Sequence, residues 1–304
     1  MQPFRTRLQD PRPIVADGAM GTMLQRWGLT PGDCPERVNL EDPGILKEIA
    51  EQYLAAGAEI LQTNTFGGSP LKLAHYGLDG RTEEINSGAI AAVRGVIGDR
   101  AYLSASCGPS GRMLEPYGDA NPDLVFESFR RQMGAIVAEG VDMICIETMT
   151  DLAEAVLAVK AAKSVSLSLP VCATMTFDAT PRGFLTVMGT DVETAIRGLE
   201  EAGADVIGSN CGNGIVNMVH VAEQFLGMTA LPVIIRSNAG IPFLKDGAIV
   251  YPESPEFMAE QSRALLTMGV NIIGGCCGTT PDHVAALRQA RDAFLGHNSP
   301  KTFP

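Results

Sequence analysis

The stretch Ala202-Gly203-Ala204-Asp205-Val206-Ile207-Gly208 joins the end of an amphipathic helix to the start of an apolar strand. A glycine directly after a helix commonly ends it in the left-handed conformation, and the acidic residue then opens the strand. Similar phrases recur at residues 56–59, 139–142 and 268–271. Four occurrences of one phrase indicate a chain built from a repeated strand–helix unit.

Eight short apolar, β-branched runs predict strands. They lie at residues 14–16, 59–63, 101–105, 143–146, 170–174, 206–208, 233–235 and 270–273. Their continuous apolar character suits strands that are buried on both faces, as in parallel sheets. Amphipathic helical patterns separate them, for example at residues 151–159. The sequence therefore predicts an α/β fold, a single (β/α)8 TIM barrel, with a doubly wound open sheet as the alternative.

The barrel is expected to occupy residues 1–296 as one domain, with residues 297–304 as a C-terminal tail. In such a barrel the chemistry lies on the loops that follow the strands. Three of these loops are long and contain Gly and Pro, at residues 108–122, 178–189 and 238–254. We expect them to form lids or substrate walls rather than simple connections.

Composition narrows the class of protein. Only 19% of the residues are charged and 45% are hydrophobic, which favours a well-buried core over disorder. The net charge of −12 counts against nucleic-acid binding and serves either solubility or a complementary partner surface. No apolar run approaches the roughly 18 residues of a membrane span, and the N-terminus lacks a signal-peptide pattern. A cytoplasmic protein is expected, and its oligomeric state is not indicated.

Seven cysteines without a secretion signal indicate reduced thiols rather than a disulfide framework. Cys145 and Cys172 lie inside apolar strands, where a cysteine packs as a small hydrophobe. Packing is also favoured for Cys107, at the end of the third strand. Cys211 follows the sixth strand, and the Cys276-Cys277 pair follows the eighth. In a barrel, these last three cysteines would share the catalytic face.

Adjacent cysteines have Cα atoms only about 3.8 Å apart, less than a disulfide usually spans. Three soft thiolates at one point instead suit Zn²⁺ and leave its fourth position open for a substrate. Such a site removes the proton of a bound thiol and keeps its sulfur nucleophilic. It serves alkyl transfer to sulfur better than hydrolysis. A redox site without metal is the alternative.

Several motifs resemble the homocysteine S-methyltransferase family, over nearly the whole chain. The most specific is Gly274-Gly275-Cys276-Cys277-Gly278-Thr279-Thr280-Pro281, together with the distant Asn210-Cys211. The others are Asp17-Gly18-Ala19-Met20-Gly21-Thr22, Gln62-Thr63-Asn64-Thr65-Phe66, Ile146-Glu147-Thr148 and Asn238-Ala239-Gly240. The resemblance implies a zinc-containing barrel in which Cys211, Cys276 and Cys277 ligate the metal and form the catalytic centre.

The resemblance also implies a substrate site. By motif match, Asp17 and Glu147 would hold the ammonium group of homocysteine, and Gly18 belongs to the same motif as Asp17. Thr148 and Asn238 would position the substrate through polar contacts. The alternative for either carboxylate is a helix cap or a loop hydrogen bond.

Within the family, the chain looks most like the homocysteine-binding module of cobalamin-dependent methionine synthase. Gly108-Pro109-Ser110-Gly111, Met175-Thr176-Phe177-Asp178, Gly189-Thr190-Asp191 and Val250-Tyr251-Pro252 carry this likeness. Gly67 stands where the betaine-using branch has a tyrosine. Ser237 departs from the proline that the synthases usually have before Asn-Ala-Gly.

The implied reaction is methyl transfer from methylcobalamin to homocysteine, giving methionine. The folate- and cobalamin-binding modules of the long synthases are absent from this sequence, which could also be a piece of a longer synthase. No histidine lies in an Asp-x-His-x-x-Gly corrinoid motif. A separate corrinoid protein is therefore expected to carry the cobalamin. The alternatives are S-methylmethionine or betaine as the donor, another thiol acceptor, or a zinc-binding, corrinoid-docking protein without turnover.

Overall fold

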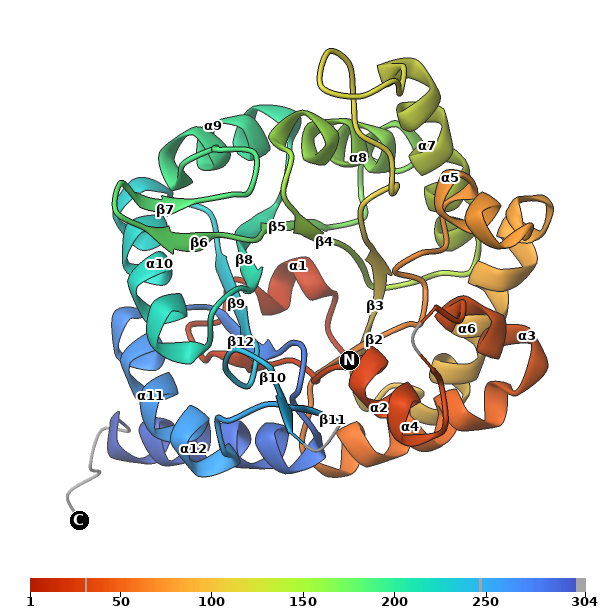
Figure 1. Ribbon diagram of the computed structural model, residues 1–304. Coiled ribbons are helices and arrows are strands. Elements are labelled where there is room, and N and C mark those ends of the chain that lie inside the picture. Colours follow the sequence, from red (N-terminus) through yellow and green to blue (C-terminus); the bar gives the residue numbers. More distant parts are fainter. Residues whose placement is uncertain (31, 246–247, 299–304) are drawn as a thin grey trace.

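Eight parallel strands form the centre of the molecule in a computed structural model that describes residues 1–30, 32–245 and 248–298. Each of the eight runs that the sequence analysis named overlaps one of these strands, and six of the strands extend beyond the C-terminal end of their run (Figure 1). The eight strands are β1 (Ile14–Val15), β2 (Ile60–Gln62), β3 (Tyr102–Cys107), β4 (Met143–Met149), β5 (Val171–Met175), β8 (Val206–Cys211), β9 (Val233–Ser237) and β12 (Ile272–Gly275).

The strands follow one another around the sheet in the order of the sequence, β1-β2-β3-β4-β5-β8-β9-β12. β12 pairs with β1 in register Ile272 to Ile14, and a bridge between Ala16 and Ile60 joins β1 to β2. The sheet therefore closes on itself. The predicted (β/α)8 barrel is confirmed, and the doubly wound open sheet, which keeps two free edges, is excluded.

A ring of helices surrounds the strands (Figure 1). Its members are α4 (Pro43–Ala55), α6 (Thr82–Ile97), α7 (Pro122–Ala138), α8 (Leu152–Val165), α9 (Val192–Ala202), α10 (Ile215–Met228), α11 (Pro255–Met268) and α12 (Pro281–Asn298). The remaining helical segments are short: α1 (Phe4–Arg7), α2 (Met20–Arg26), α3 (Val38–Glu41), α5 (Pro70–Leu73) and the 3₁₀ turns Pro35–Arg37, Ala74–Tyr76 and Asp79–Arg81. Within the described residues, no helix combines the length and apolar character that crossing a bilayer requires.

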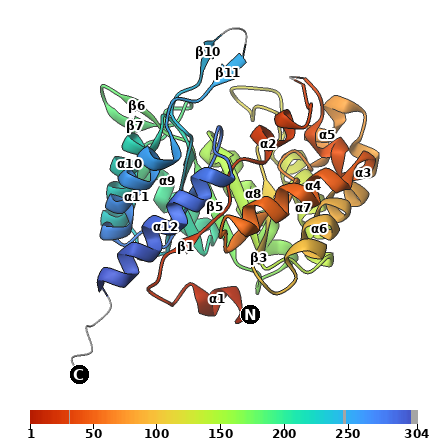
Figure 2. The same ribbon diagram turned by 90° about the horizontal axis from the view of Figure 1, so that it is seen from below.

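Two apolar layers hold the barrel together. The larger one lies between the strands and the helices. The smaller one fills the barrel interior and includes Cys145 and Cys172, so these cysteines pack as the sequence analysis expected. Helix α1 covers the end of the barrel opposite the loops that follow the strands (Figure 2), and its Phe4 packs edge-on against Tyr102, with ring centroids 5.0 Å apart. Cys107 belongs to the outer layer and donates to Gln132 Oε1 at 3.2 Å.

The recurring phrase of the sequence has a structural explanation. Its four glycines, Gly57, Gly140, Gly203 and Gly269, all have φ between 74° and 96°. The residue two positions later turns its side chain back to the preceding strand and accepts a backbone N–H there. These bonds are Val15 to Glu59 at 3.1 Å, Leu103 to Asp142 at 2.7 Å, Val171 to Asp205 at 2.8 Å and Val233 to Asn271 at 2.8 Å. The phrase thus joins the strands in four pairs.

Two of the three long loops contain hairpins that the sequence analysis did not predict. β6 (Asp178–Thr180) pairs with β7 (Gly183–Leu185), and β10 (Phe243–Lys245) pairs with β11 (Ala248–Val250). The β10–β11 hairpin projects from one end of the barrel (Figure 2). At the C-terminus, α12 runs to Asn298, so the first two residues of the expected tail belong to this helix; the rest, 299–304, lies outside the described residues.

Candidate metal centre

Three cysteine side chains meet at the C-terminal end of the strands. Cys211 is the last residue of β8, and Cys276 and Cys277 directly follow β12. The Sγ atom of Cys211 lies 2.9 Å from that of Cys276 and 4.0 Å from that of Cys277. All three sulfurs lie within 4.8 Å of one another. The shortest distance exceeds the roughly 2.05 Å of a disulfide bond, so the structure brings together three free thiols.

This donor set fits a zinc ion. Two sulfurs bound at about 2.3 Å in a tetrahedral site lie about 3.8 Å apart, close to the separation of Cys211 and Cys277. Hydrogen bonds with Cys211 and Cys276 lower the pKa of Cys277 to about 3. The bonds to Cys276 and Cys277, with burial, raise the pKa of Cys211. Three thiolates this close together repel one another, so a cation is needed to hold all three deprotonated.

The backbone around the cysteines is unusual in two places. Cys211 has φ 62°, a left-handed conformation that non-glycine residues rarely adopt. Gly278, which follows the cysteine pair, has φ 82°, and a Cβ added there would lie 2.1 Å from the ring of Tyr251. Glycine at 278 thus lets the tyrosine that follows the β10–β11 hairpin pack against the cysteine loop.

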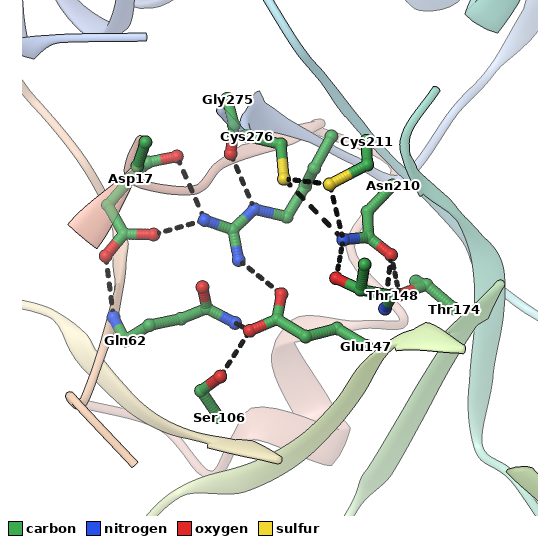
Figure 3. Close-up of polar contacts among 12 residues, drawn as sticks. Asp17, Gln62, Ser106, Glu147, Thr148, Thr174, Asn210, Cys211, Gly275 and Cys276 are labelled. Carbon is green, nitrogen blue, oxygen red and sulfur yellow. Dashed lines mark hydrogen bonds and ion pairs between the residues drawn. The ribbon is translucent and has the colours of Figure 1, made fainter. Parts of the chain in front are cut away.

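Asn210 connects the cysteine cluster to the neighbouring strands through its side-chain amide. Its side-chain nitrogen lies 3.6 Å from Cys276 Sγ and donates to Thr148 Oγ1 at 2.8 Å (Figure 3). Its side-chain oxygen accepts from the Thr148 backbone N–H and from Thr174 Oγ1, each at 2.7 Å. Asn210 is fully buried. It therefore connects the sulfurs of the cluster with the end of β4, where Thr148 also has φ 62°.

Two carboxylates face each other next to the cysteines, Asp17 after β1 and Glu147 in β4 (Figure 3). The guanidinium of Arg236, from β9, contacts both: Nη2 lies 2.8 Å from Asp17 Oδ1, and Nη1 lies 3.4 Å from Glu147 Oε2. The exposed fraction of Arg236 is 3%. A buried cation thus lies between the two groups to which the resemblance assigned the substrate's ammonium.

Burial dominates the electrostatics of the two carboxylates but not that of the arginine. It raises the pKa of Asp17 to about 6, although Arg236 opposes the shift. Burial likewise raises the pKa of Glu147, against the effects of Arg236, Ser106 and Gln62. For Arg236, burial favours the neutral form, but the two carboxylates outweigh it and raise the pKa. The guanidinium therefore remains charged.

A cavity of about 260 Å³ opens over the cysteines and Glu147. Of the residues implied by the resemblance, the three cysteines, Gly18, Glu147 and Thr148 line it, whereas Asp17 and Asn238 are not among its lining residues. A Cβ at Gly18 would lie 2.8 Å from the Tyr53 hydroxyl, which explains glycine there. Asn238 donates to Gly212 O at 2.9 Å, and its buried Oδ1 has no hydrogen-bond partner among the described residues.

Sequence reasoning missed two residues of the site. Arg236 lies in the apolar run of β9, and a charged residue within an otherwise buried strand was the available signal. Asn210 was quoted only as part of the cysteine motif. Its contacts to Thr148 join β8 to β4, two strands that are not neighbours in the sheet, so no local pattern indicates them.

Residues 14–291 match the family model for homocysteine S-methyltransferase. The chain belongs to this family. Curated relatives agree with the match: the methionine synthase of Mycobacterium tuberculosis is 31% identical over 296 residues, and that of Mycobacterium leprae is 30% identical over 296 residues. Each alignment covers 92% of this chain and 24% of the relative. The chain thus spans about a quarter of the length of these synthases.

Solved structures of a homocysteine methyltransferase share the fold. The metallated form of the homocysteine methyltransferase MmuM from Escherichia coli superposes with a TM-score of 0.78 at 21% identity. The match covers 95% of this chain and 99% of that one. The apo form of the same protein matches with a TM-score of 0.73. At this level of identity the likeness shows the common barrel.

Proposed function

We propose that this homocysteine S-methyltransferase family barrel binds zinc through Cys211, Cys276 and Cys277 and prepares the thiol of homocysteine for methyl transfer. The convergence of the three Sγ atoms within 4.8 Å carries the proposal. Zinc, when bound, would lower the pKa of the acceptor thiol and hold its sulfur as a nucleophilic thiolate. The three thiolates would leave one position of the metal open to that sulfur.

The chain's own residues supply the rest of the acceptor site. We propose Glu147 as the group nearest the acceptor's ammonium, because it lines the cavity and is held there by Gln62 and Ser106. Asp17 adds negative charge from behind Arg236. Gly18 and Thr148 shape the wall. Asn238 lies outside the cavity lining and bonds Gly212 O, next to Cys211, so we propose that it positions the acceptor through the cysteine loop.

For the donor, we propose methylcobalamin carried by a separate corrinoid protein. The curated methionine synthases, with about four times the length of this chain, support this choice. In the reaction, the sulfur forms a bond to the methyl carbon while the donor's bond to that carbon breaks and its electron pair stays on the donor. Thiols that must remain reduced fit a cytoplasmic location.

The test is to purify the full chain, measure its zinc content, and assay methionine formed from homocysteine. Methylcobalamin, free or on a corrinoid carrier, S-methylmethionine and betaine are offered in parallel. We expect about one zinc ion per chain and methionine from methylcobalamin. Protein without zinc after growth and dialysis in zinc-containing buffer would overturn the proposal. Methionine from S-methylmethionine or betaine alone would replace the proposed donor.

A further inference from the structure

Among the described residues that line the cavity, Arg236 is the one cation, and each of its three side-chain nitrogens already has a partner. Its Nε donates to Gly275 O at 3.0 Å, and Nη2 donates to Asp17 Oδ1 at 2.8 Å. Nη1 lies 3.4 Å from Glu147 Oε2. An arginine side chain stays protonated in proteins. The guanidinium is therefore a permanent positive charge at the edge of the cavity.

The remaining oxygens of both carboxylates also have partners within the chain. Asp17 Oδ2 accepts from the Gln62 backbone N–H at 2.7 Å. Glu147 Oε1 accepts from Gln62 Nε2 at 3.2 Å and from the Ser106 hydroxyl. All four carboxylate oxygens are thus hydrogen-bonded before an acceptor arrives. The cavity is lined by Glu147 and Arg236 but not by Asp17.

We infer that Arg236 fills the cation position of the Asp17–Glu147 pair, so that the acceptor's amino group contributes little to binding. An ammonium that touched both carboxylates would lie against the guanidinium, a like charge in a buried site where repulsion is screened less than in water. Glu147 alone stays accessible from the cavity. The acceptor class therefore extends from homocysteine to small thiols of the same length that lack the amino group.

This inference rests on the proposed function, and direct binding tests it without a methyl donor. Zinc-loaded full-length protein is titrated in a calorimeter with homocysteine and with 4-mercaptobutyrate, which is homocysteine without its amino group. We expect dissociation constants within about tenfold of each other, because Arg236 already neutralises Glu147 and the ammonium gains at most about one net hydrogen bond there, which is worth roughly that factor.

The calorimetric outcomes distinguish a failure of this inference from a failure of the proposed function. A site built to bind the ammonium through two buried carboxylates would reject the analogue by a factor of roughly 10⁴. A preference for homocysteine above about 100-fold would overturn the inference and leave the proposed function standing. Binding of neither thiol to the zinc-loaded protein would overturn both.

A variant pair sharpens the test. Arg236→Met removes the guanidinium and frees the carboxylates, so the preference for homocysteine over 4-mercaptobutyrate should rise at least about tenfold. Arg131→Met, which removes a surface partner of Glu83, should keep the wild-type preference. A folded Arg236→Met protein with an unchanged preference contradicts the inference. If that variant does not fold, the two wild-type dissociation constants decide alone.

Discussion

At the scale of single residues, Asn210 fixes the geometry around the sulfurs. It bonds both the backbone and the hydroxyl of Thr148 and lies 3.6 Å from Cys276 Sγ. Partners of this kind orient metal ligands, and their loss typically weakens metal binding by 10–100-fold. The arrangement therefore depends on the side chain behind the cysteines as well as on the cysteines themselves.

Replacing one cysteine should separate the metal ligands from the other thiols. In Cys211→Ser, a hard hydroxyl replaces a soft thiolate. We expect zinc to be lost on dialysis and methyl transfer to fall by at least about 100-fold, measured by metal analysis and methionine formation. Cys34→Ser, a buried cysteine outside the cluster, should retain both. Full activity in Cys211→Ser would refute the ligand assignment.

The sequence could predict the three cysteines as metal ligands, because three thiols placed at strand ends on the catalytic face of a barrel are typical of a metal site. It could not indicate that Asp17 and Glu147 already share a guanidinium. Arg236 reaches them from β9, and each of the three comes from a different part of the chain. Only the closed barrel brings these side chains together, so motif matching named the carboxylates and missed their partner.

At the scale of elements, the recurring helix–strand phrase makes a sharp prediction. Asn271 Oδ1 accepts the Val233 N–H at 2.8 Å, where the other three phrases use a carboxylate oxygen. Asn271→Ala leaves that backbone donor without its partner, which should lower the free energy of unfolding by about 1–3 kcal/mol. Asn271→Asp restores an acceptor and should lie close to the wild type in urea unfolding. Equal losses in both variants would show that the bond contributes nothing.

Asp205 occupies the same position in its phrase, and its contacts lead us to predict that the free energy of unfolding decreases at low pH. Burial raises its pKa, but bonds from Lys163, Val171 N and Arg5 outweigh burial and lower the pKa below 3.8. The folded protein therefore binds this proton less readily than the unfolded chain. The group's stabilisation is complete above pH 3.8 and is lost as the pH falls through the lowered pKa.

Urea midpoints measured between pH 2 and 6 check this. The urea midpoint should decrease less steeply toward low pH in Asp205→Asn than in the wild type. Asp99→Asn, at an exposed turn, should keep the wild-type slope. An identical slope in Asp205→Asn would contradict the assignment.

The strands could be predicted because burial on both faces produces a continuous apolar run. The ring helices could be predicted because burial on one face produces an apolar residue at every third or fourth position. The hairpins β6–β7 and β10–β11 could not, because their strands have three residues each and are partly or wholly exposed. Phe243, Leu244 and Lys245 are all exposed. Without a buried face there is no alternation to read, and such a segment resembles an irregular loop.

For the whole molecule, the cysteine cluster connects distant parts of the barrel wall. Cys211 belongs to β8, whereas Cys276 and Cys277 follow β12, and β9 lies between these strands. A cation bound only in the folded state stabilises that state by mass action. We expect zinc to raise the Tm of the metal-free protein in a concentration-dependent manner in thermal denaturation. Cys211→Ser should show no such increase, and the same increase in that variant would place the zinc elsewhere.

The left-handed backbone at Cys211 favours glycine for stability, whereas the proposed metal site requires a cysteine there. A non-glycine residue there costs roughly 1–2 kcal/mol relative to glycine, and glycine would fit φ 62° without that strain. The chain therefore gives up stability at position 211 in exchange for a sulfur atom. A strained non-glycine residue at this strand end thus identifies position 211 as one whose side chain is chosen for function rather than for packing.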